Sequence, residues 1–180
     1  MSIVDRTFDK LIGLHCWGVE YDSQLNISLS FGKPVLYIRE PPESKSESQR
    51  SKRRTVRVKG EWWLWIFCSY WKISFDGKKA AGSSSGWRQI MIAIGRLNGQ
   101  ILKSVSVNPK SGATRFEFDL GGVLEVRRFE RDSSDVLWML YKPNGYVLAV
   151  RGDGQFTHEK RSRIPEKLKP RRIVGRIEHH

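Results

Sequence analysis

The sequence predicts a mainly β fold. We expect two pseudo-repeated antiparallel β units, forming a sandwich or a partly open barrel, with a short helix before each unit. The strands are predicted by residues 25–31 and 115–120, which alternate apolar and polar side chains as half-buried strands do. The repeat is predicted by the pattern of residues 11–40, which recurs after residue 97 with similar spacing.

Each copy predicts a β-hairpin at its first pair of strands. The first predicted strand is followed by Gly32 in the first copy and by Gly121 in the second. The apolar segments 35–39 and 123–127 come next in the sequence. Two strands joined by a short glycine-containing turn are typical of a hairpin. The later strands are expected in matched pairs, residues 63–67 with 136–140 and residues 72–77 with 147–154.

The helices and domain limits follow from the same comparison of the two copies. Residues 87–94 predict a short helix that leads into the second copy, and residues 3–10 occupy the equivalent place before the first. We therefore expect one β domain over residues 1–158, with its two copies at about residues 8–79 and 90–156.

The first copy contains an insertion. The spacing between matched positions falls from 89 residues at the first hairpin to 73 at Trp65 and Trp138. The inserted segment, residues 41–59, is rich in Ser, Pro and charged residues and predicts a basic mobile loop.

Positive charge is concentrated in two segments. Residues 41–60 hold seven Lys or Arg against two Glu, and residues 159–180 hold eight against three. Each segment therefore carries +5 of the total net charge of +13, so the remaining chain is nearly balanced. We expect residues 159–180 to form a basic tail, which ends in His179 and His180 where a truncated purification tag would sit.

The Trp-rich segment at residues 62–71 is unusual because both faces of its predicted strand are apolar. One interpretation is a central strand that is covered on both sides. The other is a strand with one face in an interface or ligand groove, because Trp is enriched at binding hot spots. The candidate interface residues are Trp62, Trp63, Trp65 and Trp71.

The basic segments also allow two interpretations. They are either solvated chain or an electrostatic contact to nucleic acid or to an acidic protein. The stretch of basic residues has no interleaved aromatic residue, although platforms for single-stranded nucleic acid normally combine the two. The candidate polyanion contacts are Arg50, Lys52, Arg53, Arg54, Arg171 and Arg172.

No residue pattern predicts a catalytic site, a metal site or a cofactor. His15 and Cys16 are neighbours on a predicted strand, so their side chains point to opposite faces and cannot pair. We expect Cys16 and Cys68 to be buried free thiols. Asp76 and Asp153 each precede glycine, as is typical of tight turns. The interpretation leans toward a protein that is not an enzyme and has no cofactor.

The chain predicts no membrane segment. It lacks the apolar stretch of a signal peptide and any run of eighteen apolar residues, so we expect a cytoplasmic protein. An unpaired edge strand would also permit a homodimer.

A spaced pattern of apolar residues and glycines marks the second copy: Leu97-Asn-Gly99, Val105, Val107, residues 116–124 and Trp138. The pattern resembles small bacterial domains of unknown function, over residues 8–40 and 61–156 of this chain. Some such β proteins resemble the immunity proteins that accompany bacterial toxins, which implies stoichiometric binding. This chain departs from that resemblance in charge, because a protein that masks a basic nuclease site is expected to be acidic.

Three hypotheses about function follow. The preferred one is a non-enzymatic protein-binding module of bacterial type, immunity-like in role, with an unknown protein partner. The first alternative is a nucleic-acid-associated protein that uses the basic loop and tail, with affinity that falls steeply with salt. The second is a ligand-binding protein or enzyme with a pocket between the repeats, favoured if His15, Glu20, Asp22 or the tryptophans surround one deep cavity.

Overall fold

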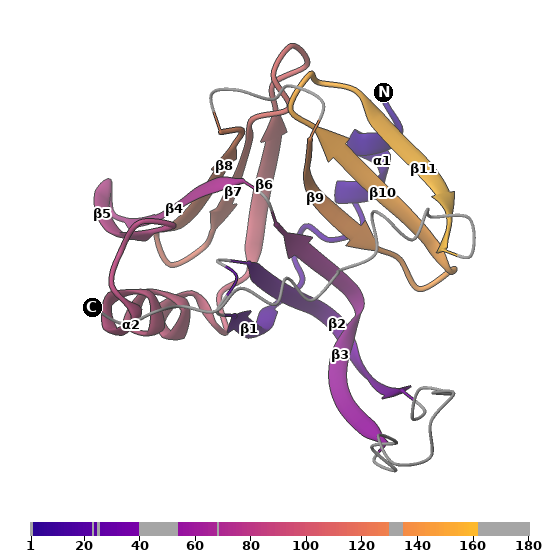
Figure 1. The fold of residues 1–180 in the computed structure, drawn as a ribbon, viewed down its shortest axis with the longest axis horizontal. Helices are drawn as coiled ribbons and strands as arrows, with labels where there is room; N and C mark the ends of the chain where they lie inside the picture. Colours follow the sequence, from indigo (N-terminus) through magenta and orange to yellow (C-terminus); the bar gives the residue numbers. More distant parts are fainter. Residues whose placement is uncertain are drawn as a thin grey trace, which may run out of the picture.

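The computed structural model describes residues 2–22, 24, 26–39, 54–67, 69–129 and 135–161. Its strands form two antiparallel sheets that enclose a common apolar core and do not close into a barrel (Figure 1). The predicted mainly β class is confirmed, in the form of a sandwich.

The two sheets contain six and five strands in the described residues. Sheet 1 has the order β1 (Cys16–Tyr21), β2 (Ile27–Arg39), β3 (Thr55–Ile66), β9 (Val136–Tyr141), β10 (Tyr146–Arg151), β11 (Phe156–Lys160). Sheet 2 has the order β5 (Lys78–Gly82), β4 (Tyr70–Phe75), β8 (Gly122–Arg127), β7 (Thr114–Phe118), β6 (Leu102–Val107).

Strand pairing follows the same order in the two halves of the chain. Strands β1, β2 and β3 form a meander in sheet 1, after which β4 and β5 pair in sheet 2. Strands β6, β7 and β8 form a meander in sheet 2, after which β9 to β11 join sheet 1. The halves meet at the pairs β3–β9 and β4–β8, so neither sheet is completed by one half alone.

Both predicted helices are present. Helix α1 (Ile3–Phe8) begins with a capping box in which Ser2 and Asp5 satisfy each other's backbone N–H groups. Its Phe8 ring lies edge-on against Trp138, with ring centroids 5.5 Å apart. Helix α2 (Trp87–Leu97) buries Ile90, Ala93, Ile94 and Leu97. Within the described residues, no helix is both long and apolar enough to cross a membrane.

The core lies between the inner faces of the sheets. One cross-strand row in sheet 1 joins Leu29, Leu64, Leu140 and Leu148, each at most 1% exposed. Because side chains alternate along a strand, the residues between them point to the outer face of the same sheet. Every position in the body of sheet 1 is therefore assigned to one of two faces.

The predicted hairpin of the first copy is wrong. Strand β2 runs without a turn through Gly32, and both of its parts pair with β3, with a register shift between Phe31 and Pro34. Gly32 has φ of +73°, which here makes a bulge. A bulge forms because β3 is long enough to pair on both sides of it. In the second copy the predicted hairpin is present, since β7 pairs with β8.

The predicted limits of the insertion and of the later strands also change. Strand β3 begins at Thr55, so the end of the predicted loop is a strand, whereas residues 40–53 lie outside the described residues. Strands β3 and β8 are the third strands of their respective halves, so β3 corresponds to β8. The sequence instead matched residues 63–67, at the end of β3, with residues 136–140 of β9, which is the next strand along the chain. Strand β11 takes in the start of the predicted tail, and residues 162–180 lie outside the described residues.

Candidate binding surface

The four tryptophans predicted at an interface lie in different surroundings. Trp62 and Trp71 are 7% and 0% exposed within the core between the sheets. Trp65 lies on the outer face of sheet 1 in a second apolar cluster and is also 7% exposed. Trp63, on the same outer face, is only partly buried. Trp62 and Trp65 are buried on opposite faces of β3, which favours the interpretation of a strand covered on both faces, whereas Trp71 lies on β4 in the other sheet.

The outer face of sheet 1 carries a stack of aromatic rings. Trp63 stacks on Trp65 and on Tyr141, with ring centroids 6.1 and 4.8 Å apart. Trp65 in turn stacks on Phe67 at 4.2 Å. The Lys59 ammonium lies over the Trp63 ring, 3.3 Å from its centroid. The rings therefore pack against one another and against a cation on the outer face of sheet 1.

Strands β2 and β3 extend past the body as a two-stranded ribbon, which projects to the lower right in Figure 1. We call its described residues, 33–39 and 54–59, the arm. The arm leaves the body where Gly60 pairs with Pro34. A Cβ atom on Gly60 would lie 2.5–2.6 Å from backbone atoms of its neighbours, so only glycine fits there.

Side-chain hydrogen bonds fix the root of the arm to the body. The indole Nε1 of Trp17 donates to the Gly32 carbonyl oxygen at 3.0 Å. The Lys33 backbone N–H donates to the Glu61 carboxylate at 3.2 Å. Both bonds hold the bulged strand β2 at the place where it leaves the sandwich, so the direction of the arm is set by the body.

One face of the arm is entirely apolar. The strand register places Leu36 opposite Val58 and Ile38 opposite Val56, and all four side chains share one face. Their exposed fractions are 65% for Leu36, 50% for Val58, 55% for Ile38 and 56% for Val56. We call these four residues the apolar face of the arm.

The opposite face of the arm contacts the body. Here Val35 pairs with Lys59 and Tyr37 pairs with Arg57. Lys59 reaches the Trp63 ring, and the Arg161 guanidinium lies 4.6 Å from the Tyr37 ring centroid and 5.4 Å from that of Tyr141. The face of the arm that carries Tyr37 and Lys59 thus contacts other parts of the chain, while the apolar face is exposed to solvent.

The arm is strongly basic. Residues 33–39 and 54–59 contain five Lys or Arg and no Asp or Glu. Burial lowers the pKa of the Lys59 ammonium to about 8, with Glu20 opposing that shift and Arg57 adding to it. The arm therefore combines an exposed apolar face with a net positive charge, and two of its cations, Arg57 and Lys59, lie on the opposite face.

The predicted polyanion contacts are placed only in part. Arg54 directly precedes β3 and is exposed. The residues outside the described part of the chain are Arg50, Lys52, Arg53, Arg171 and Arg172.

The residues considered for catalysis do not form a site. His15 is exposed and forms an isolated β-bridge with Ile101. The neighbouring Cys16 is a buried free thiol, and burial raises its pKa. Cys68 lies outside the described residues. Among the described residues, no three His, Cys, Asp or Glu side chains are close enough together to hold a metal ion.

Asp76 and Asp153 occupy tight turns, as predicted. Asp76, with φ of +50°, precedes Gly77 in the turn between β4 and β5. The Asp153 carboxylate accepts from Arg151 Nη2 at 2.9 Å and from the Gln155 backbone N–H at 3.0 Å. The Asp153 carboxylate therefore stabilises the local backbone of its turn, and the Asp76 backbone N–H donates to the Gly121 carbonyl oxygen at 3.2 Å.

Strands from both halves of the chain do line a hollow on the outer face of sheet 2. None of the three residues named for the pocket hypothesis lines it: His15, Glu20 and Asp22 lie elsewhere. Asp22 instead accepts hydrogen bonds from the backbone and side chain of Asn26.

Sequence analysis missed the apolar face of the arm. The signal was present, since residues 55–59 alternate polar and apolar side chains and residues 35–39 were predicted as a strand. The pairing of these two segments with each other, beyond the edge of the body, was not predicted.

Comparisons with known proteins give no relative: no protein-family model, curated protein or solved structure matches the chain.

Proposed function

We propose that this protein is a non-enzymatic protein-binding module, and that it docks its partner through the apolar face of the arm. The observation that carries the proposal is the exposure of Leu36, Ile38, Val56 and Val58, each at least half exposed on one face of a projecting ribbon. Single exposed apolar residues are ordinary, whereas a contiguous apolar surface is typical of interaction sites.

The energetics favour a covered state of this face. A two-stranded ribbon is marginally stable in water by itself, and the apolar face contributes nothing to the core of the body. Burying the exposed part of these four side chains against a partner would contribute about 1 kcal/mol each before the costs of association. Polar β-branched residues would form the same strands without attracting a partner.

Charge defines the chemistry of the partner. With five cations and no carboxylate among its described residues, the arm fits an apolar groove that is bordered by Asp or Glu. The same charges disfavour a dimer formed arm against arm, because ten cations would be brought together. An immunity-like role for this chain therefore requires an acidic partner.

Cross-linking in the producing cells tests the proposal. A photoreactive residue at Ile38 should capture a specific protein, and that protein is then purified. Calorimetry should show binding to the intact chain that weakens at least tenfold when Leu36, Ile38, Val56 and Val58 are all replaced by Thr.

A matched variant of helix α2 serves as the control. Met91 and Ile92 are 41% and 58% exposed on α2, and their replacement by Gln should leave the affinity unchanged. Equal affinity of the arm variant and the intact chain would contradict the proposal. So would recovery of nucleic acid alone, released by salt.

The nucleic-acid alternative has less support from the described residues. Bases bind single-strand platforms by stacking on open aromatic faces. Here Lys59 lies over Trp63, and Arg161 lies over Tyr37 and Tyr141, so cations of the chain already contact these rings. Its test remains the salt dependence of oligonucleotide binding, which should be steep if phosphates are neutralised.

A further inference from the structure

Two adjoining hollows mark the outer face of sheet 2. The first has a volume of about 570 Å³ and is lined by β4 of the first half and by β6, β7 and β8 of the second. The second, of about 300 Å³, shares Ala113 and Arg127 with the first and is also lined by Arg128. We call the two together the Arg127 hollow. Its size is in the range of small-molecule sites, roughly 300–1,000 Å³.

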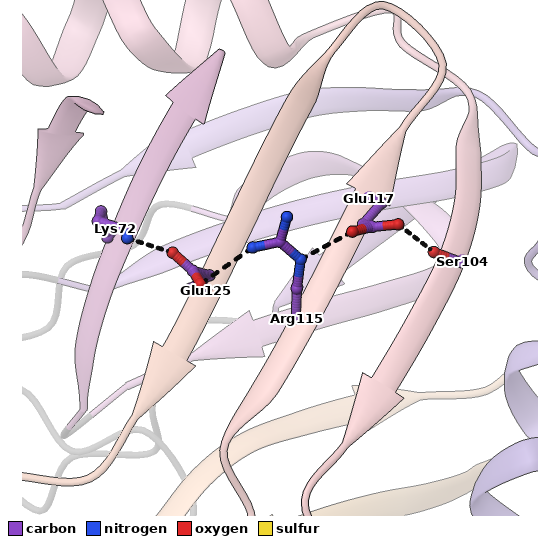
Figure 2. A network of polar contacts seen from close by, with 5 residues as sticks. All are labelled: Lys72, Ser104, Arg115, Glu117 and Glu125. Carbon is purple, nitrogen blue, oxygen red and sulfur yellow. Dashed lines mark hydrogen bonds and ion pairs between the residues drawn. The ribbon is translucent and has the colours of Figure 1, made fainter. Parts of the chain in front are cut away.

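A row of paired charges runs across the strands of sheet 2 (Figure 2), and its members Lys72, Arg115 and Glu125 line the larger hollow. Lys72 pairs with Glu125, whose other carboxylate oxygen accepts from Arg115 Nη1 at 3.0 Å. Arg115 Nε donates to Glu117 at 2.7 Å, and Ser104 donates to the same carboxylate at 2.8 Å. The bonds from Arg115 and Ser104 lower the pKa of Glu117, and those from Lys72 and Arg115 lower the pKa of Glu125. The row is therefore ionised and balanced in charge.

The next row of the sheet contains an unbalanced cation. Tyr70 pairs with Arg127 across β4 and β8, and the Arg127 guanidinium lies 4.3 Å from the Tyr70 ring centroid. No carboxylate of the described residues forms an ion pair with Arg127. A guanidinium stacked on a ring keeps its in-plane N–H donors free for a ligand.

The second cation of the hollow is Arg128. Its Nη1 donates to the Gly152 carbonyl oxygen at 3.2 Å, which holds the side chain in place without neutralising it. Since Lys72 and Arg115 are balanced by Glu125 and Glu117, the charge of Arg127 and Arg128 is in excess among the described residues. Counted over the described residues, the hollow thus carries two net positive charges next to the small side chain of Ala113.

We propose that the Arg127 hollow binds a phosphate monoester, with Arg127 as the principal contact. A phosphate monoester carries close to two negative charges above its second pKa of about 6, which matches the excess charge of the hollow. The planar guanidinium of Arg127 can donate two parallel hydrogen bonds to phosphate oxygens. The organic part of the ligand would lie along Tyr70 and Val107, which line the larger hollow. This site is separate from the arm and does not depend on the proposed function.

Titration of the full chain with phenyl phosphate, at constant ionic strength and a pH above that second pKa, tests the proposal. Binding followed by NMR of the arginine Nε–H groups should be saturable and should shift the Arg127 signal. Arg127→Gln should weaken binding about tenfold, the loss expected for charged hydrogen bonds. Dimethyl phosphate, a monoanion, should bind more weakly than phenyl phosphate.

A charge-matched variant separates a site from general attraction. Arg88 is an exposed cation on α2, and Arg88→Gln removes the same charge without touching the hollow. Equal weakening by Arg88→Gln and Arg127→Gln, or the absence of saturable binding, would overturn the proposal. If Arg127→Gln fails to fold, Arg127→Lys keeps the charge but loses the planar donor pair, and it should still weaken binding.

A second probe distinguishes the source of the phosphate. A phosphotyrosine peptide that binds much more tightly than phenyl phosphate would identify a phosphorylated protein segment. Equal affinity would identify a small phosphate ester. The four-residue arm variant should bind either probe as the intact chain does, so failure of the phosphate site and failure of the arm are told apart.

Discussion

Strand β2 carries two stretches with apolar side chains in opposite surroundings. In the body, Leu29 and Phe31 are 0% and 1% exposed, whereas in the arm Leu36 and Ile38 are 65% and 55% exposed. Both stretches pair with β3, so backbone hydrogen bonding is alike in the two. The difference lies in the second layer: sheet 2 covers the body stretch, and the apolar face of the arm has no equivalent cover among the described residues.

This contrast separates two roles of an apolar strand. An alternating pattern specifies which face can be covered, and the rest of the fold decides whether it is covered. In the body the pattern stabilises the folded chain. In the arm, our proposal is that the apolar face docks a partner, so changes in the two stretches should affect different measurements.

The largest expected effect is at the junction of the two regions. Gly60→Ala would place a Cβ atom 2.5–2.6 Å from backbone atoms of Phe31 and Trp62, which cannot move without disturbing the core. We expect a loss of about 3 kcal/mol in the free energy of unfolding, at the upper end of overpacking costs. Urea denaturation followed by Trp fluorescence measures this loss.

Gly95→Ala is the control for this substitution. A Cβ atom on Gly95 has no heavy atom within 4 Å, and the residue lies inside helix α2. Alanine there should stabilise the protein by about 0.5–1 kcal/mol, because glycine is a poor helix former. A Gly60→Ala variant as stable as the wild type would mean that the arm can move at its root independently of the body.

The two glycine junctions show how far sequence alone could go. Residues 25–39 and 115–127 have similar patterns, and both predicted hairpins, yet only the segment at Gly121 turns. There the Asp119 carboxylate accepts from the Ile101 backbone N–H at 2.7 Å, and Asp76 N–H donates to the Gly121 carbonyl at 3.2 Å. Both contacts come from distant segments, so local sequence could not distinguish a turn from a bulge.

The candidate sites also differ in how far the sequence could predict them. The opposite faces of Trp62 and Trp63 follow from the period of a strand, and sequence alone predicted them. The Arg127 hollow depends on the pairing of β4 with β8 from the other half of the chain, which no local pattern specifies.

A smaller effect is expected from the contact between arm and body at Lys59. Its pKa is about 8 in the folded chain against an ordinary value of 10.5. Between these values the unfolded state binds more protons, so stability should rise with pH from about 8 to 10. Because the side chain is partly exposed, we expect a rise of only about 1 kcal/mol.

The variant Lys59→Met isolates this titration. Methionine keeps an apolar stem against Trp63 and cannot titrate, so the pH-dependent gain should be absent from the variant and should equal the change with pH in the stability difference between the two proteins. Denaturation curves at both ends of the pH range measure it. Parallel behaviour of wild type and variant would show that Lys59 is not held against the body in solution, and that the arm is not braced there.

The smallest effect on stability is expected from substitutions in the apolar face of the arm, although our proposal predicts the largest loss of binding there. Replacing Leu36, Ile38, Val56 and Val58 by Thr keeps strand propensity and removes only exposed apolar surface, so unfolding should change by less than about 0.5 kcal/mol per residue. The matched change in the body, Leu29→Thr, places a hydroxyl in the core on the same strand and should cost about 3 kcal/mol. Denaturation of both variants gives the comparison. A large loss from the arm substitutions would show that this face packs against the rest of the chain in solution, and the apolar face would then belong to the fold and not to a partner.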